Sequence, residues 1–570
     1  MAGCSPAPSP PTSAGPSPSA TVPASSSAAS PVGAAPTCPP LGAQPSGAIP
    51  AALGRPGWWR GRVFYEIFVR SFADSDGDGI GDLRGATARL DHLNDGDPAT
   101  TSDLGITGIW LMPIAESPSY HGYDVTDETA VEADYGTLAD LRAFVAAAHE
   151  RGIAVVTDLV LNHTSNQHPW FRESDAGTGR QDWYVWSDTD PGYGGPDGQM
   201  VWHPSGGRWY YGLFGRGLPD LNVANPAVAA EMAMVARFWL EDVGIDGFRL
   251  DAIKHLIEDG RNQVHTEATH RWLGDFRDGI HAYAPDALLV GEVYDLSVAV
   301  ARYVPEDVDL AFDFDRAQAT IDSIRRGDAA ALLSVLAEDA ELFGADETAG
   351  FLTNHDQSRI ASQLREDPAA LRLAAGLLLT GAGTPFLYYG EEIGLTGEKP
   401  DELIRTPMPW TGDGPAAGFT TGTPWEPLAA GWETRNVAAQ VDDPGSLLAA
   451  YRDLIDLRAS QPALALGTSV PLESSDTAVA AFLRARADGP GRVVVVANVA
   501  DRAVAAPALE LVDGPLCGTS TARVVYRTGI STPADLAVAA PTINPSGGLG
   551  PWTPFPELPP RSVTVIDLGG

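Results

Sequence analysis

Eight short apolar runs, each bounded by turn residues, alternate with helix-like segments between Trp58 and about Ser460. Runs of this length are typical of buried parallel strands, and parallel strands need crossover segments such as helices between them. Two of the helices have clear starting signals, at 137–140 and at 225–226. The predicted strands are 63–69, 106–113, 153–161, 247–251, 288–293, 310–314, 350–353 and 385–389. The pattern predicts an α/β chain built on a closed (β/α)8 TIM barrel.

The spacing of these strands leaves one long interval, 164–222, which is rich in Trp, Tyr and Gly and has little helical periodicity. We expect it to form a subdomain inserted after the third strand. Beyond the last predicted helix the chain changes to short β-rich runs separated by Gly and Pro, which predicts a C-terminal antiparallel β-sandwich over 462–570. The barrel is then predicted to occupy 56–163 and 223–461.

The N-terminal segment 1–55 has a different composition from the rest. Its first fifty residues contain 13 prolines, and no Asp, Glu, Lys or Arg precedes Arg55. Such a composition predicts a disordered tether. Met-Ala-Gly-Cys4 followed by Ser-Pro-Ala-Pro looks like the end of a bacterial lipoprotein signal, so Cys4 is a candidate for lipidation. An accidental cysteine in a disordered tail is the alternative.

The net charge of −37, from 37 basic and 74 acidic residues, argues against nucleic acid and against anionic membranes as partners bound through surface charge. Cys4, Cys38 and Cys517 are too few for a disulfide scaffold, their odd number leaves at least one unpaired, and no Cys-x-x-Cys motif supports a zinc or redox site. We expect an extracellular monomer, held at the cell surface if Cys4 carries a lipid.

Three acidic residues, Asp251, Glu292 and Asp356, stand at or just past the ends of predicted strands. Barrel active sites form at the C-terminal strand ends, so acids far apart in sequence can meet at one mouth. Glycoside hydrolysis needs one protonated carboxyl group, one ionised carboxylate and stabilisation of a cationic sugar-like transition state. The three acids therefore favour sugar chemistry.

Four motifs at these strand ends resemble the α-amylase family of retaining glycoside hydrolases. They are Asp158-Leu-Val-Leu-Asn162-His163, Gly247-Phe-Arg249-Leu-Asp251-Ala-Ile-Lys254-His255, Gly291-Glu292-Val293 and Asn354-His355-Asp356, in the family's order. The resemblance extends from Trp58 to the C-terminus. It implies that Asp251 is the nucleophile, Glu292 the general acid and then base, and Asp356 the carboxylate that stabilises the transition state.

The neighbouring residues agree with these roles. Arg249 lies two residues before Asp251 on the same face of a strand, so its guanidinium can hold that carboxylate ionised. Glu292 has no basic neighbour in its own segment, so burial can raise its pKa and keep a proton available. In a retaining enzyme the two working carboxyl groups stand roughly 5 to 5.5 Å apart.

The resemblance also implies a set of substrate-binding residues. It makes His163 and His355 donors to hydroxyls of the sugar under attack, a task for which neutral imidazole is suited. In the segment Tyr120-His121-Gly122-Tyr123-Asp124, Tyr123 is the expected aromatic platform and His121 a further contact. Lys254 and His255 are expected on the leaving-group side.

The sequence gives two opposing indications of substrate size. Exo-acting glucosidases of this family usually carry Asp at the position of Tyr120, so its absence favours an open cleft and internal α-1,4-glucosidic bonds of starch-like glucans. The segments 390–394 and 405–410 look instead like the oligo-1,6-glucosidase branch, which suggests an intermediate group. An α-glucosidase, a transglycosylase or a trehalose-forming isomerase stays open, and a sugar-binding lipoprotein is the non-enzyme alternative.

Two calcium sites are predicted. The loop from Asp74 to Asp82 places oxygen ligands at positions 1, 3, 5, 7 and 9, and lacks the Glu of a helix-loop-helix site because position 12 is Gly85. Its expected ligands are Asp74, Asp76, Asp78, the Ile80 carbonyl and Asp82. A solvated acidic turn is the alternative. The second site is implied by the resemblance alone, at Asn162, Asp220 and the His255 carbonyl.

Overall fold

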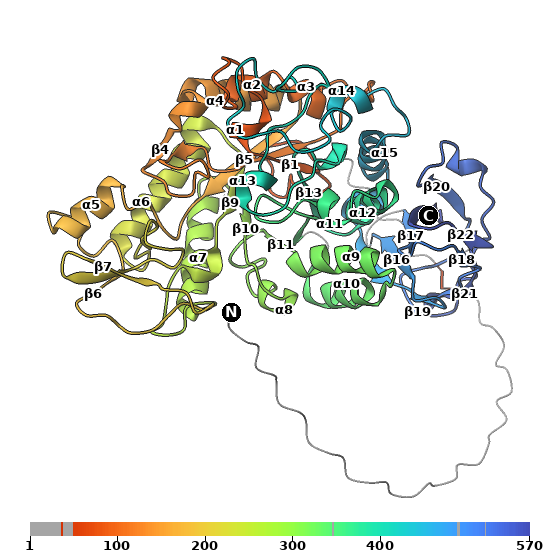
Figure 1. Ribbon diagram of the computed structural model, residues 1–570. Helices are drawn as coiled ribbons and strands as arrows, with labels where there is room; N and C mark the ends of the chain where they lie inside the picture. Colours follow the sequence, from red (N-terminus) through yellow and green to blue (C-terminus); the bar gives the residue numbers. More distant parts are fainter. Residues whose placement is uncertain (1–35, 38–49, 345–346, 487–490, 519, 570) are drawn as a thin grey trace, which may run out of the picture.

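A computed structural model describes residues 36–37, 50–344, 347–486, 491–518 and 520–569 (Figure 1). Most of the predicted tether, including Cys4 and Cys38, lies outside these residues. Cys517 is disulfide-bonded. In the part of the chain that is described, no helix is both long and apolar enough to cross a membrane.

Eight parallel strands form a closed barrel, as predicted, in the order β1-β13-β12-β11-β10-β9-β5-β2. Their bounds are β1 Phe64–Ile67, β2 Gly108–Leu111, β5 Ala154–Leu159, β9 Gly247–Leu250, β10 Leu288–Gly291, β11 Leu310–Phe312, β12 Thr348–Gly350 and β13 Thr384–Tyr388. The seventh strand is shifted from its predicted position, 350–353. Its ladder ends at Gly350, although Phe351 and Leu352 continue the buried apolar run, so hydrophobicity alone did not mark the strand's end.

Helices cover the outside of the barrel and connect successive strands (Figure 1). The predicted starts of two of them are confirmed: Thr137 and Asp140 form a capping box on α4, and Asn225 caps α6 with Pro226 in its first turn. The principal covering helices are α4 Leu138–Glu150, α6 Pro226–Arg237, α7 Glu267–His281, α9 Phe314–Arg326, α10 Ala330–Leu342, α12 Pro368–Thr380 and α15 Leu447–Ser460. Because each connection returns the chain to the opposite end, all strand C-termini lie at one mouth.

Between β5 and α6 the chain leaves the barrel and forms a protruding unit (Figure 1, left). It contains α5 (Pro169–Ala176) and a three-stranded sheet in the order β6 (Trp186–Ser187), β8 (Arg208–Tyr211) and β7 (Trp202–Ser205). A β-bridge between His163 and Asp220 closes the base of this unit beside the barrel mouth. The inserted subdomain therefore forms one wall of the mouth.

The C-terminal region is built from antiparallel sheets, as predicted (Figure 1, right). A five-stranded sheet packs against a three-stranded sheet around an apolar core of their inward-facing side chains. The larger sheet has the order β14 Thr468–Pro471, β16 Val479–Ala485, β17 Arg492–Asn498, β23 Ser562–Asp567 and β20 Arg523–Arg527, and the smaller one β15 Glu473–Ser474, β19 Leu509–Asp513 and β21 Gly547–Trp552. Arg484 of β16 reaches the end of α12 and donates to the Thr380 carbonyl at 2.5 Å, which ties this region to the barrel.

Candidate active site

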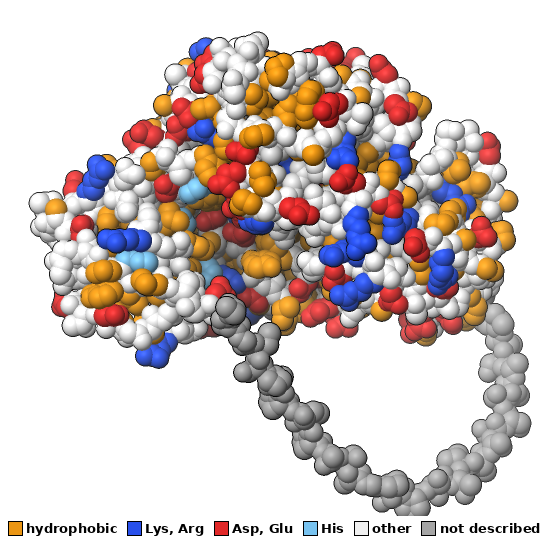
Figure 2. Space-filling view, viewed as in Figure 1, with side chains coloured by type: hydrophobic (Ala, Val, Ile, Leu, Met, Phe, Trp, Pro, Cys, Tyr) orange, Lys and Arg blue, Asp and Glu red, His pale blue; other side chains and the backbone are white. Residues whose placement is uncertain are grey.

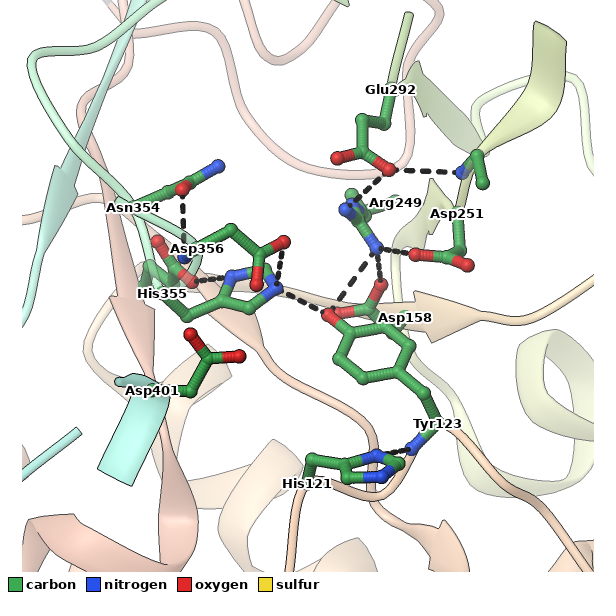
Figure 3. Close-up of polar contacts among 12 residues, drawn as sticks. His121, Tyr123, Asp158, Arg249, Asp251, Glu292, Asn354, His355, Asp356 and Asp401 are labelled. Carbon is green, nitrogen blue, oxygen red and sulfur yellow. Dashed lines mark hydrogen bonds and ion pairs between the residues drawn. The ribbon is translucent and has the colours of Figure 1, made fainter. Parts of the chain in front are cut away.

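The three predicted acids meet at the mouth of the barrel (Figure 3). Asp251 follows the last residue of β9 directly, Glu292 follows β10 in the same way, and Asp356 lies in the loop after β12. All three are in contact with one network of buried charged groups. The sequence-based expectation that strand ends bring these acids together is thus met by the topology.

Arg249 of β9 joins the two acids that flank it. Its Nη1 lies 2.6 Å from Asp251 Oδ1, and its Nη2 lies 2.8 Å from Glu292 Oε2. Nη1 also pairs with Asp158, a fully buried carboxylate that additionally accepts from Trp110 Nε1 at 2.9 Å. The sequence indicated the pair between Arg249 and Asp251 but not the second pair with Glu292, because Glu292 comes from a neighbouring strand.

Burial raises the pKa of Asp251, and the ion pair with Arg249 opposes that rise. Burial likewise raises the pKa of Glu292; Arg249 opposes it, while the charges of Asp251 and Asp356 add to it. Because the two carboxyl groups share one guanidinium and repel each other, they titrate as a pair. Such a pair readily holds one proton and one negative charge, which is the state that acid catalysis beside a carboxylate nucleophile requires.

Asp356 has the opposite electrostatics. Although burial opposes ionisation, His355 and Arg405 lower the pKa of Asp356 far below its usual range. His355 Nε2 lies 3.3 Å from Asp356 Oδ2, and Arg405 Nη2 donates to Asp356 Oδ1 at 2.9 Å. Asp356 is therefore a fixed negative charge at the mouth.

His355 has electrostatic surroundings that the sequence did not indicate. It is completely buried, with Nδ1 2.6 Å from Glu66 Oε1 and Nε2 2.7 Å from the Tyr123 hydroxyl. Burial lowers the pKa of His355, but the charges of Asp356 and Glu66 outweigh it and raise that pKa to about 10. His355 is thus an imidazolium held between two carboxylates, which sequence could not show because Glu66 comes from β1.

His163 and His121 remain neutral candidates for contact with a sugar. Burial lowers the pKa of His163 to about 4, and its Nε2 has no hydrogen-bond partner among the described residues. His121 accepts a hydrogen bond from the backbone N–H of Tyr123 at 3.1 Å, and burial lowers its pKa as well. Tyr123 stacks its ring on His355 at 5.6 Å, so the predicted platform lies beside Asp356.

A cavity of about 330 Å³ opens beside the acids. It is lined by Asp197, Phe214, Ala252, Lys254, His255, Glu292, Tyr294, Phe314, Asn354, Asp356 and Gln357. Acidic and histidine side chains gather in the centre of the face shown in Figure 2, between the inserted subdomain and the rest of the barrel. The cavity brings Lys254 and His255 together with two of the three acids, as the motifs implied.

Lys254 is held in place by the loop after β10, and His255 by the segment that follows it in the chain. Lys254 Nζ donates to the Tyr294 carbonyl at 2.6 Å and to Asp295 Oδ2 at 3.1 Å. His255 Nδ1 lies 3.2 Å from the Gln263 carbonyl, and burial lowers the pKa of His255 to about 4. The side of the cavity that they line therefore carries one fixed positive charge.

Sequence reasoning missed five residues of this site: Glu66, Asp158, Phe214, Tyr294 and Asp401. A lone acid in the apolar run 63–69 could have signalled Glu66, and Asp158 opens a motif that was recognised. Asp401, which lies near His355 and Asp356 (Figure 3), accepts a hydrogen bond from Arg405 at 3.2 Å, but its own segment carries no signal. Phe214 and Tyr294 are large aromatics left 46% and 66% exposed, and only the structure shows that exposure.

Three of the residues predicted for the first calcium site, Asp74, Asp76 and Asp78, are suitably placed for a cation. Asp74, Asp76 and Asp78 each offer a carboxylate oxygen, and these oxygens lie within 4.8 Å of one another. Asp82 is used differently, because it caps α2 (Leu83–Thr87) and accepts from the Gly85 and Ser75 backbone N–H groups, each at 2.7 Å. Calcium prefers oxygen ligands of this kind, so the chemistry of the first three donors fits it.

The second predicted site also has suitable oxygens. Asn162 Nδ2 donates to Asp220 Oδ2 at 3.0 Å, while Asn162 Oδ1 is buried and has no partner among the described residues. Burial, together with the charge of Glu258, raises the pKa of Asp220 well above its usual range. An unpartnered oxygen beside buried acids fits a divalent cation; no described contact joins the His255 carbonyl to this group.

Comparison with known proteins agrees with this geometry. Residues 66–467 match the family described as "Alpha amylase, catalytic domain". Alpha-amylase 3 of Dictyoglomus thermophilum is 37% identical over 433 residues, covering 75% of this chain and 82% of that protein. The trehalose synthase/amylase TreS of Mycolicibacterium smegmatis is 35% identical over 492 residues, covering 75% of this chain and 80% of that protein. The crystal structure of α-amylase from H. orenii superposes with a TM-score of 0.77 at 38% identity, covering 89% of this chain and 99% of that one.

Proposed function

Because the chain belongs to the α-amylase family of glycoside hydrolases, we propose that it cleaves internal α-1,4-glucosidic bonds of starch-like glucans and maltooligosaccharides with retention of anomeric configuration. The proposal is supported by the placement of Glu292 and Asp356 in the lining of one cavity, with Asp251 joined to Glu292 through Arg249. The substrate is thus an α-glucan rather than a nucleic acid or a membrane lipid.

In the first step, Glu292 gives its proton to the glycosidic oxygen while the bond from that oxygen to the anomeric carbon breaks. The carboxylate of Asp251 attacks the same carbon from the opposite face and forms a glycosyl ester. Asp356, which stays ionised, stabilises the positive charge that develops on the sugar ring. Arg249 orients both working acids through its two terminal nitrogens.

In the second step, the carboxylate of Glu292 takes a proton from a water molecule. The resulting oxygen attacks the anomeric carbon and displaces Asp251, so two inversions give net retention. His163, with its unpartnered Nε2, and His355, as an imidazolium, supply fixed polar groups beside the sugar. A sugar hydroxyl that takes the place of water in this step would give transglycosylation.

Internal cleavage is supported by the exposed aromatic side chains at the cavity rim. Phe214, from the inserted subdomain, and Tyr294, from the loop after β10, both line the cavity and are exposed. Flat apolar rings exposed beside polar groups suit the faces of sugar units beyond the cleaved bond. Where exo-acting relatives carry Asp, this chain has Tyr120, whose ring stacks on Trp425 with the centroids 5.4 Å apart. No carboxylate therefore occupies that position.

Product analysis on four substrates tests the proposal. Soluble starch, maltotriose, isomaltose and maltose should be incubated separately with the full chain. We expect a rapid fall in starch chain length with short maltooligosaccharides as first products, and little action on isomaltose. Glucose as the only early product would show attack from chain ends, and trehalose from maltose would show isomerisation.

An exo-acting α-glucosidase is the second candidate, favoured by Asp401. This carboxylate binds Arg405, which in turn binds Asp356, so an acid stands near the site despite the tyrosine at 120. In that case Asp401 would bind a terminal glucose, as the Asp of exo-acting glucosidases at the position of Tyr120 does. Asp401→Asn should leave starch cleavage within about twofold if the enzyme is endo-acting, and should raise KM for maltose sharply if it is exo-acting.

We further propose that the enzyme works outside the cell, as a monomer, with bound calcium. The disulfide at Cys517 supports an oxidising compartment. Asp74, Asp76 and Asp78 would hold one ion and Asn162 with Asp220 another, which would neutralise the repulsion of their carboxylates and fix the loops that carry them. Lipidation of Cys4 remains a proposal based on the sequence.

A further inference from the structure

A second cavity, of about 620 Å³, lies away from the catalytic acids where the barrel meets the C-terminal region. Its polar lining comes from the end of α9, the end of α11 (Ile360–Gln363) with the segment that leads to α12, and the turn before β23. The charged residues are Arg325, Arg326, Arg365 and Arg561 with Asp322 and Asp367. Figure 2 shows basic side chains gathered over this part of the molecule, to the right of the centre.

The charge of this lining is opposite to that of the chain. The whole sequence has 37 basic and 74 acidic residues, whereas the cavity has four arginines and two aspartates. A random patch of this protein would carry a negative charge. The local excess of two positive charges therefore marks the cavity as an exception on a strongly acidic protein.

The two aspartates do not occupy all of the guanidinium groups. Asp322 pairs with Arg326 at 3.2 Å, and Asp367 pairs with Arg561. Within the described part of the chain, Arg325 and Arg365 have no carboxylate partner, and the buried Nε of Arg561 has no hydrogen-bond acceptor. Donors for an anion are thus available on both sides of the cavity.

Arg365 lines this cavity from a turn with an unusual backbone. Arg365 and the following Glu366 both adopt the left-handed region, with φ of 56° and 60°. That region is unfavourable for residues with a Cβ. Glu366 is fixed by its N–H bond to the Ala361 carbonyl at 2.7 Å and by an ion pair with Arg435, so the turn is anchored.

We propose that this cavity binds a sugar phosphate. A phosphate monoester carries a charge of about −1.5 to −2 at pH 7, which matches the net charge of the lining, and its oxygens fit the planar fork of arginine. The cavity is much larger than a phosphate group. Gln363, Asp322 and Asp367 supply oxygens that can accept hydrogen bonds from sugar hydroxyls.

Calorimetric titration of the full chain with glucose 6-phosphate tests the proposal, with glucose and inorganic phosphate as separate probes. We expect binding of glucose 6-phosphate that weakens with added salt, and at least tenfold weaker binding of the other two. The double variant R325Q/R365Q should lose at least tenfold in affinity. The variant R237Q/R523Q removes two exposed arginines elsewhere and should bind as the native chain does.

Three results would overturn the assignment: no heat with glucose 6-phosphate, equal affinity for glucose or inorganic phosphate, or unchanged affinity in R325Q/R365Q. Because the titration measures binding and needs no turnover, its outcome is independent of the glucan-cleaving activity proposed above. A melting curve of R325Q/R365Q that coincides with the native curve shows that any loss of binding is local.

Discussion

At the residue scale, one guanidinium governs the chemistry of the site. Arg249 contacts Asp251, Glu292 and Asp158, so the two working acids cannot be tuned independently. In the proposed mechanism, their different roles follow from their positions relative to the sugar and from the charges around them. Burial raises the pKa of both, while Asp356 stays ionised.

Glu292→Gln should show whether Glu292 protonates the leaving group, because its effect can be compared on substrates that do and do not need that proton. On starch we expect a loss of roughly 10²- to 10⁴-fold in kcat, the usual contribution of general acid catalysis. On an α-maltosyl fluoride, whose leaving group needs no proton, the loss in the first step should be at least tenfold smaller. Glu267→Gln, on an exposed face of α7, is the matched control. Equal losses on both substrates would remove Glu292 from the acid role.

The imidazolium of His355 should appear in the pH dependence of stability. Its pKa is raised from 6.5 to about 10, so its contribution is fully present below pH 6.5 and is lost as the pH rises toward 10. The difference in unfolding free energy between native protein and His355→Gln should therefore shrink across that range, by at most about 1.4 kcal/mol per pH unit. Denaturant titrations at several pH values would measure it. A constant difference would mean that His355 is neutral in the folded protein.

The sequence was sufficient for residues whose role shows in their own segment. Asp251, Glu292 and Asp356 stand at strand ends, and the barrel topology alone brings them together. The sequence could not predict contacts between strands. Glu292 and Arg249 are 43 residues apart, and His355 and Glu66 are 289 residues apart. The pKa of a buried histidine depends on such contacts, which is why the sequence alone could not indicate that, against the effect of burial, Asp356 and Glu66 raise the pKa of His355.

At the element scale, the strands were predicted more accurately than the loops. Each of the eight barrel strands is a buried apolar run, and only β12 was misplaced, because its apolar run continues beyond the ladder. The loop from Asp74 to Asp82, predicted to bind calcium, shows the limit for irregular segments. Its spacing suggested five ligands, but Asp82 is engaged as the cap of α2.

Removal of calcium should destabilise the protein through this loop. A ligand that binds only the folded state adds about 2.7 kcal/mol at a hundredfold excess over Kd, so a chelator should lower the melting temperature by several degrees. Asp76→Asn with Asp78→Asn should reduce that drop, and Asp95→Asn with Asp97→Asn, in another exposed acidic turn, should not. An unchanged melting curve after chelation, in a preparation then shown to contain no residual metal, would contradict both calcium sites.

At the scale of the whole molecule, the C-terminal sheets and the barrel share buried polar contacts. Arg484 of β16 donates to the Thr380 carbonyl at 2.5 Å and also to the Gly381 carbonyl. These carbonyls belong to the end of α12, where a helix leaves acceptors unpaired. Arg484 also donates to the Gly467 carbonyl at 2.6 Å, within its own region. The two regions should therefore unfold together.

Arg484→Leu tests that coupling. It leaves buried carbonyls without a donor, and we expect a loss of about 3 kcal/mol or more in unfolding free energy. Arg484→Lys keeps the positive charge but loses the planar guanidinium, so its loss of unfolding free energy should lie between those of the native protein and Arg484→Leu. Denaturant unfolding followed by tryptophan fluorescence and by circular dichroism would measure both. A separate early transition of the C-terminal region would show that it is not coupled to the barrel.

The most direct test of the account is the anomeric form of the first product released from soluble starch. Proton NMR recorded within the first turnovers distinguishes the two anomers before mutarotation mixes them. Attack by Asp251, followed by attack of water on the same face as the original bond, predicts the α-anomer. The β-anomer as first product would contradict the assignment of Asp251 as nucleophile and, with it, the proposed mechanism.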